Sequence, residues 1–231
     1  MAPKVLIVLT SVDYIEAANK PTGWYLSELS HPYDILTRAG VEVVTASPKG
    51  GVAPLEEASV TAYKDDASAQ AFLAQKKPVW EQTRRISDFR GRADEFAALF
   101  YPGGHGPMFD LVDDADSIAV IEEFVARGKT VAAVCHGPVA FLSAKRADGT
   151  PLLAGREATG FSNAEEDVIG MSRFMPFLLE DRIRDVGATF RKAGENWGEL
   201  VVVQDGGKLI TGQNPASAKG VGEAILKAIG A

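Results

Sequence analysis

The sequence is poor in the residues that build disulfides and histidine metal sites. It contains one cysteine, Cys135, and three histidines in 231 residues. A single cysteine cannot form an internal disulfide, so nothing favours secretion. His31, His105 and His136 show no spacing typical of metal ligands. We therefore predict neither a metal nor an organic cofactor.

Long apolar runs and an excess of positive charge are also missing. The run Val5-Leu6-Ile7-Val8-Leu9 near the start is too short for a signal peptide. It is also too short to span a membrane, which takes about 20 residues. The formal net charge of −7 disfavours binding to phosphate backbones and anionic membrane surfaces. The sequence thus predicts no nucleic-acid or membrane partner, and a cytoplasmic location is expected.

Short apolar runs are present, and they alternate with helical patterns. We expect strands at 5–10, 41–46, 96–101 and 130–134, and a late hairpin of 200–204 with 208–211 joined at 205–207. Strands that alternate with helices predict a mainly parallel sheet covered on both faces. In such sheets ligands bind at the carboxyl ends of the strands.

Helices are expected between these strands. Apolar spacing predicts a helix within 22–39, where Pro32 should kink it or delay its start. Asp116 is the expected N-cap of a second helix, and residues 215–229 are expected to form the last helix.

The polar segment 54–95 breaks the alternation. We predict a single domain over 1–231 with a helical insertion or cap at about 54–95. A solvated decoration at the sheet edge and a lid over the active site both remain open as interpretations of this segment.

Cys135 follows a predicted strand and precedes a predicted helix. A buried cysteine is often just a small apolar side chain. A strand-to-helix turn, however, exposes a nucleophile, and a helix N-terminus would lower the thiol pKa. His136 is adjacent, but sequence neighbours need not meet side chain to side chain, so coincidence remains an alternative.

Glycines follow another predicted strand, at Gly103-Gly104-His105-Gly106. They allow close approach of a ligand, and their N–H groups can receive an oxyanion, although glycines after strands often only turn the chain. His105 is interpreted as a structural or surface residue. Considered alone, Glu28 would be a surface carboxylate.

Four segments together resemble one known family. These segments, which follow in order over nearly the whole chain, are 102–110 (PGGHGPMFD), 132–138 (AAVCHGP), 159–161 (TGF) and 211–218 (TGQNPASA). They resemble the ThiJ/PfpI superfamily, in its branch of glutathione-independent glyoxalases of the fungal heat-shock type. The resemblance implies an α/β, flavodoxin-like three-layer sandwich with a mainly parallel central sheet, and a homodimer.

The resemblance also implies site residues. Cys135 falls on the family nucleophile and His136 on its neighbouring histidine. The carboxylate that orients this histidine matches Glu166 better than Glu165. The buried glutamate that hydrogen-bonds the sulfur falls on Glu28, and the oxyanion hole on the backbone N–H groups of Gly104 and His136.

The implied activity is that of a glyoxalase III, a D-lactate dehydratase that converts methylglyoxal, a small 2-oxoaldehyde, to D-lactate through a hemithioacetal on Cys135. Two alternatives remain open. One is a cysteine peptidase or amidase, which an extended cleft would favour. The other is a stress chaperone or redox-sensing protein with deglycase activity, in which the thiol is oxidised and exposed apolar patches bind clients.

Overall fold

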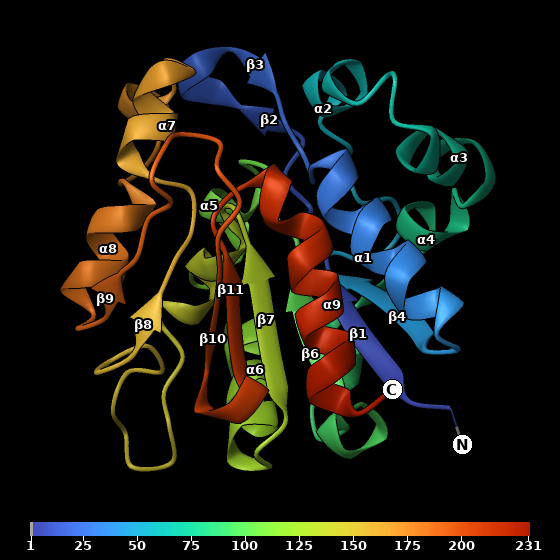
Figure 1. The fold of residues 1–231 in the computed structure, drawn as a ribbon, viewed down its shortest axis with the longest axis vertical. Coiled ribbons are helices and arrows are strands. Elements are labelled where there is room, and N and C mark those ends of the chain that lie inside the picture. Colours follow the sequence, from blue (N-terminus) through green and yellow to red (C-terminus); the bar gives the residue numbers. More distant parts are fainter. Residues whose placement is uncertain (1) are drawn as a thin grey trace.

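A computed structural model describes residues 2–231 and has a seven-stranded sheet at its centre (Figure 1). The strand order is β10-β11-β7-β6-β1-β4-β5, and only β10 and β11 pair antiparallel. The strands of this sheet are β1 (Lys4–Val8), β4 (Glu42–Ser47), β5 (Arg84–Arg85), β6 (Ala98–Tyr101), β7 (Thr130–Val134), β10 (Val201–Gln204) and β11 (Leu209–Gly212). Two small sheets pair β2 (Tyr14–Ile15) with β3 (Lys20–Pro21) and β8 (Glu157–Ala158) with β9 (Thr189–Phe190).

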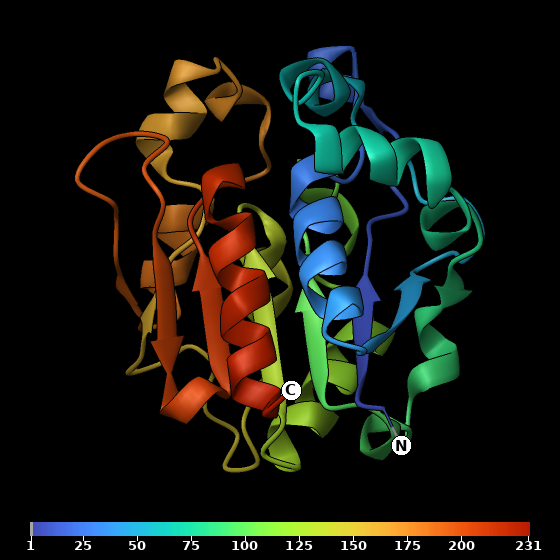
Figure 2. The same ribbon diagram turned by 45° about the vertical axis from the view of Figure 1, so that its right-hand side comes forward.

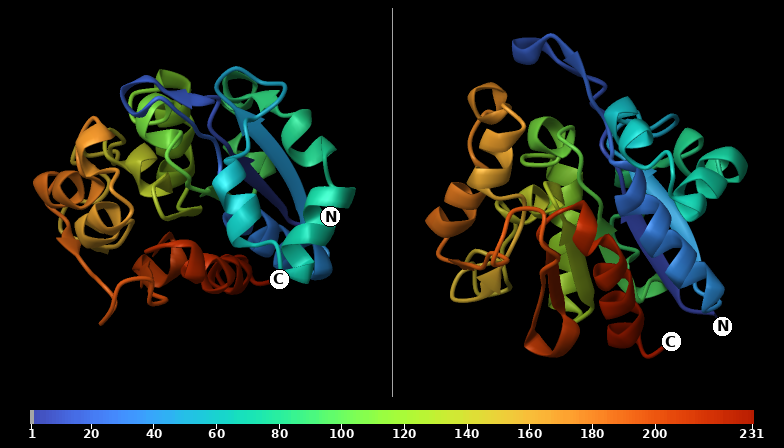
Figure 3. Two further views of the ribbon diagram at one scale, coloured as in Figure 1. Left: turned by 90° about the horizontal axis from the view of Figure 1, so that it is seen from above. Right: turned by 45° about the horizontal axis from the view of Figure 1, so that its top comes forward.

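Helices cover both faces of the sheet and give the molecule three layers (Figure 3). The α-helices are α1 (Leu26–Arg38), α2 (Glu57–Ala62), α3 (Ala67–Gln75), α4 (Pro78–Glu81), α5 (Pro107–Asp110), α6 (Ala115–Ala126), α7 (Asn163–Val168), α8 (Leu179–Asp185) and α9 (Ala218–Ile229). The 3-10 helices are η1 (Glu16–Ala18), η2 (Ile86–Phe89), η3 (Ala93–Glu95), η4 (Gly137–Phe141), η5 (Ser172–Phe174), η6 (Asp205–Gly207) and η7 (Pro215–Ser217). Within residues 2–231, every helix is too short or too polar to cross a bilayer.

The alternation of side chains along β1 explains the continuous apolar run at the start of the chain. Val5, Ile7 and Leu9 belong to the core under α1 and α9, which lie side by side on one face (Figure 2). Leu6 and Val8 belong to the core under α6 on the other face. Because both faces are covered, every residue of the run must be apolar. The predicted flavodoxin-like three-layer sandwich is confirmed.

Two helix boundaries differ from the sequence-based expectation. The N-cap of α6 is Asp114, whose carboxylate accepts from the Ser117 N–H at 2.7 Å, so the prediction of Asp116 was wrong by two residues. Helix α1 runs through Pro32 and begins only at Leu26. It begins there because the preceding Trp24 pairs with 54–56 instead.

The segment 54–95 contains α2, α3, α4 and β5, and β5 adds a parallel strand to the edge of the sheet beside β4. Trp24, just before α1, contacts Phe72 and Trp80 of this segment, with ring centroids 6.5 and 5.5 Å away. The backbone pairing of Trp24 brings the start of the segment, including Glu56, to the end of the sheet where the site lies. The division into one domain with an insertion stays a prediction.

Candidate active site

Cys135 lies in a sharp turn directly after β7. Its φ is 60°, in the left-handed region that residues with side chains rarely adopt. The turn is held on both sides, because the Cys135 N–H donates to Gly212 O at 3.0 Å and its carbonyl accepts from the Phe161 N–H at 2.8 Å. Non-glycine residues held in this region are often functional.

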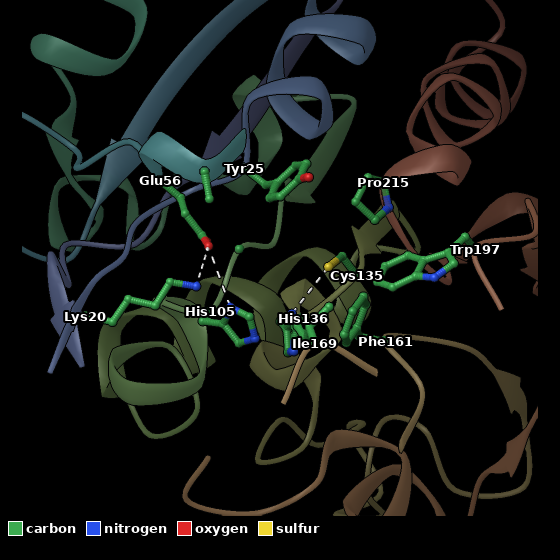
Figure 4. A pocket seen from close by; sticks show the side chains of 12 residues that line it. Lys20, Tyr25, Glu56, His105, Cys135, His136, Phe161, Ile169, Trp197 and Pro215 are labelled. Atoms are coloured by element: carbon green, nitrogen blue, oxygen red, sulfur yellow. Dashed lines mark hydrogen bonds and ion pairs between the residues drawn. The ribbon is translucent and has the colours of Figure 1, made fainter. Parts of the chain in front are cut away.

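Cys135, His136 and Glu166 form one line of contacts. The Cys135 sulfur lies 3.3 Å from His136 Nδ1 (Figure 4), and His136 Nε2 lies 2.6 Å from Glu166 Oε2. All three residues are buried. Because an ionised carboxylate only accepts, the proton of a neutral His136 lies on Nε2 and leaves Nδ1 free to accept from the thiol. The neighbours Cys135 and His136 thus do meet side chain to side chain.

Glu165 and Glu166 point in different directions from the first turn of α7. Glu165 closes a capping box with Ser162 and accepts hydrogen bonds from the side-chain amides of Gln213 and Asn214 at 3.0 and 2.8 Å. Of the two acidic residues, Glu166 is therefore the one that contacts His136. The side-chain amides of Gln213 and Asn214 hold the first turn of α7 in place.

Glu28, Cys135 and His136 converge on Gly103. Glu28 is fully buried in the first turn of α1, and its Oε2 accepts from the Gly103 N–H at 2.7 Å. A Cβ at position 103 would lie 2.7 Å from His136 N, 2.8 Å from Glu28 Oε2 and 2.9 Å from Cys135 Cβ. Any side chain at position 103 would therefore displace the Glu28 carboxyl group, the Cys135 side chain and the backbone of His136.

Gly104 brings a backbone donor to the sulfur. Its φ is +88°, and a Cβ there would lie 2.2 Å from the carbonyl oxygen of Gly23, so only glycine fits. The Gly104 N–H faces the Cys135 sulfur and, by favouring the thiolate, acts to lower the thiol pKa. The oxyanion-hole role of this N–H, and of the His136 N–H, stays a prediction.

His105 is a site residue that the sequence interpretation missed. It is not a surface residue, because only 6% of it is exposed. Its Nε2 lies 2.8 Å from Glu166 Oε1, and its Nδ1 lies 3.9 Å from Glu56 Oε2. Lys20 Nζ lies 4.0 Å from the other oxygen of Glu56. The signal for His105 was its place after β6, at the sheet edge that also carries Cys135; Glu56 lay in a segment without any such signal.

His105, His136 and Glu166 also form a cluster that their sequence spacing does not reveal. One potential ligand atom from each lies within 4.8 Å of the others. Both Glu166 oxygens already receive an imidazole N–H group. The hydrogen bonds of the two imidazoles to Glu166 therefore account for the cluster.

The thiol pKa differs from the expectation. Burial raises the pKa of Cys135 well above its usual range, and the Glu28 carboxylate raises it further. The expected lowering of the thiol pKa is thus not supported, because burial and Glu28 outweigh the backbone donor that favours the thiolate. Burial also raises the pKa of Glu28 to about 8, so this carboxyl holds a proton at neutral pH.

The imidazoles of His105 and His136 differ in their charge at neutral pH. Burial lowers the pKa of His136, and the charge of His105 lowers it further, against the attraction of Glu166. For His105, burial lowers the pKa, but the hydrogen bond to Glu166 and the negative charges of Glu166 and Glu56 outweigh burial and raise it to about 9. At neutral pH, His136 is therefore a neutral base and His105 a fixed cation.

Cys135 and His136 open into a cavity of about 170 Å³. Figure 4 shows the charged pair Lys20 and Glu56 on one side of the sulfur, with Trp197 on the other. The remaining lining residues are Tyr25, Ala58, Gly104, His105, Phe161, Ile169 and Pro215. The cavity suits a small molecule and not an extended polypeptide.

The chain is similar to known proteins over its whole length. The model of the DJ-1/PfpI family matches residues 22–228. The glutathione-independent glyoxalase HSP31 of Saccharomyces cerevisiae is 30% identical over 227 residues, which are 94% of each chain.

Two solved structures share the fold. The Rapid Encystment Protein 24 KDa of Francisella tularensis has a TM-score of 0.91 at 32% identity, over 98% of this chain and 99% of that one. The glyoxalase III of Candida albicans has a TM-score of 0.83 at 26% identity, over 98% and 97% of the two chains.

Proposed function

Because the chain belongs to the DJ-1/PfpI family, we propose that it is a glutathione-independent glyoxalase, a D-lactate dehydratase that converts methylglyoxal and water to D-lactate. The glyoxalases among its relatives support this activity. The observation that carries the proposal is the convergence of a neutral base and a protonated acid, His136 and Glu28, on the Cys135 sulfur. In amide hydrolysis the histidine itself returns its proton to the leaving amine, whereas isomerisation of a hydroxy-carbonyl unit uses a separate acid beside the base.

The first step is formation of a hemithioacetal. The Cys135 sulfur attacks the aldehyde carbon while His136 Nδ1 takes the thiol proton, and Glu166 stabilises the resulting imidazolium. The proton then passes to the former aldehyde oxygen. The Gly104 and His136 N–H groups stabilise the developing oxyanion, a contribution of about 3 kcal/mol per donor in comparable sites.

The second step moves hydrogen from the first carbon to the second. His136 removes the C1 proton while the Glu28 carboxyl donates its proton to the ketone oxygen, which gives an enediol. His136 then protonates C2, and Glu28 recovers a proton from the C1 hydroxyl. The aldehyde carbon is thereby oxidised to a thioester, and the ketone carbon is reduced to an alcohol.

Water then hydrolyses the thioester and releases lactate and the free thiol. The overall reaction adds one water to methylglyoxal. Each group of the site ends in its starting protonation state.

A lactate assay with methylglyoxal and no glutathione tests this proposal. Stereospecific detection of D-lactate should show turnover by the native protein, and Cys135→Ala should lose at least about 10³-fold in kcat. Glu28→Gln and His136→Ala should lose a similar factor, because the three groups act as a unit. If the native protein produces no lactate, the proposed function is wrong. If Glu28→Gln is fully active, Glu28 is not the acid of the mechanism.

A further inference from the structure

Trp197 is held at the cavity in a conformation that tryptophan rarely adopts. Its φ is 67°, and its backbone N–H donates to Glu165 Oε1 at 3.0 Å. The residue remains 43% exposed. A strained backbone, fixed by a buried carboxylate, thus leaves a large aromatic ring half in solvent. Such an arrangement costs stability, and strained residues of this kind are concentrated at ligand sites.

The ring belongs to a continuous apolar surface beside the sulfur. The Trp197 ring packs on Phe161 with a centroid distance of 5.6 Å, and the Phe161 ring packs on His136 at 4.5 Å. Ile169, which is 40% exposed, and Pro215 complete the lining on this side. We call Phe161, Ile169, Pro215 and Trp197 the aromatic shelf. Figure 4 shows Trp197, Pro215 and Phe161 on the side of Cys135 away from Lys20 and Glu56, and Ile169 next to His136.

We propose that the aromatic shelf binds the substituent on the ketone carbon, so that the site accepts 2-oxoaldehydes with aryl or branched alkyl groups. This proposal rests on the proposed function. The cavity measures about 170 Å³, and an apolar cavity of about 150 Å³ in another protein holds benzene. A methyl group would leave most of this space and the exposed face of Trp197 unused.

The chemistry needs no further reactant. Phenylglyoxal and one water give mandelate, with the aldehyde carbon oxidised and the ketone carbon reduced as for methylglyoxal. The substituent takes no part in the proton transfers. The shelf therefore changes which substrates bind and leaves the steps at Cys135 unchanged.

Steady-state kinetics with phenylglyoxal and methylglyoxal test the shelf. Trp197→Gly removes the ring, relieves the strain at positive φ and keeps the backbone N–H that binds Glu165, so the turn itself is retained. We expect it to lower kcat/KM for phenylglyoxal about tenfold and for methylglyoxal less than about twofold. Trp197→Phe, the matched control, should retain most of the activity on phenylglyoxal.

Two kinetic outcomes would overturn the shelf. One is an equal loss of kcat/KM on both substrates. If light scattering also shows that Trp197→Gly changes the oligomeric state, the ring is covered by a second copy of the chain and does not bind substrate. The other is native turnover of methylglyoxal without any turnover of phenylglyoxal.

A protein inactive on both substrates would overturn the proposed function, and binding then decides the shelf. Mandelate should quench the tryptophan fluorescence of the native protein and not that of Trp197→Gly. Equal quenching of the two proteins, or none of either, would overturn the shelf.

Discussion

The imidazole rings of His105 and His136 lie with their centroids 4.4 Å apart, and both bind the carboxylate of Glu166. Each ring nitrogen of His105 faces a carboxylate, that of Glu166 or of Glu56. The Nε2–H group is bound by Glu166, whereas Nδ1 lies at an ion-pair distance of 3.9 Å from Glu56 Oε2. The positive charge of His105 acts through His136, where it adds to burial in lowering the pKa. His105 is accordingly a positioning residue.

His105→Gln should move the acid limb of the pH profile. Without the neighbouring cation, the pKa of His136 rises, and His136 is neutral only at higher pH. We expect the acid limb of kcat/KM to shift upward by about one pH unit, with a larger loss at pH 6 than at pH 8. The other ionisable groups around this pair are Cys135, Glu28, Glu56, Glu166 and Lys20. A uniform loss at every pH would mean that His105 only supports Glu166.

The Cys135 thiol should be slow to alkylate at neutral pH. Burial and Glu28 raise its pKa, and the thiolate is the reactive form. Iodoacetamide labelling followed by intact-mass spectrometry should therefore be slow at neutral pH and should still accelerate at alkaline pH where an ordinary thiol has reached its plateau. Glu28→Gln, which carries no charge at any pH, should label faster than the native protein in that alkaline range. Fast labelling that is already constant at pH 6 would show a preformed thiolate.

The framework of the fold could be predicted because it follows from local patterns. The apolar run at 130–134 is a strand with the predicted bounds, and the Asp205-Gly206-Gly207 hairpin joins β10 to β11 as expected. The site residues Cys135 and His136 were found because they directly follow a strand. Glu28 and Glu166 were found by resemblance alone, since a carboxylate on a helix gives no local sign of burial.

What could not be predicted depends on contacts between distant segments. Glu56 reaches the cavity because residues 54–56 pair with Trp24. The raised pKa of Cys135 depends on how deeply the whole fold buries the sulfur and on a carboxyl group from α1. Neither the pairing nor the burial leaves a pattern within the segment that it affects.

Gly103→Ala should disrupt the site from within. The new Cβ would lie less than 3 Å from His136 N, Glu28 Oε2 and Cys135 Cβ, so these groups must move. We expect a loss of at least about 100-fold in kcat/KM and about 1–3 kcal/mol in the free energy of unfolding. Gly194→Ala is the matched control, because a Cβ there meets nothing within 4 Å. Full activity of Gly103→Ala would contradict the tight convergence on this glycine.

Glu165→Ala and Glu166→Gln should separate stability from activity. Glu165 accepts from Ser162, Gln213 and Asn214 in the interior, so its removal leaves several buried donors without an acceptor and should cost about 3 kcal/mol or more. Glu166→Gln keeps its size and mainly weakens the support of the His136 imidazolium, so kcat should fall with a smaller change in stability. Urea unfolding and the lactate assay on both variants measure the two effects. The opposite pattern would reverse the assignment of the two carboxylates.

Glu28→Gln should be more stable than the native protein at alkaline pH. Burial raises the folded-state pKa of Glu28 from 4.5 to about 8, so between these pH values the folded protein holds a proton that the unfolded chain has released. Unfolding then releases a proton, and rising pH favours the unfolded chain. The variant escapes this penalty, which reaches about 4 kcal/mol at pH 8 and vanishes below about pH 4.5. Urea unfolding at pH 5 and pH 8 measures it, with Glu223→Gln on the exposed surface of α9 as control. A stability difference between Glu28→Gln and the native protein that does not change with pH would mean that Glu28 ionises normally, and the site would lose its neutral-pH acid.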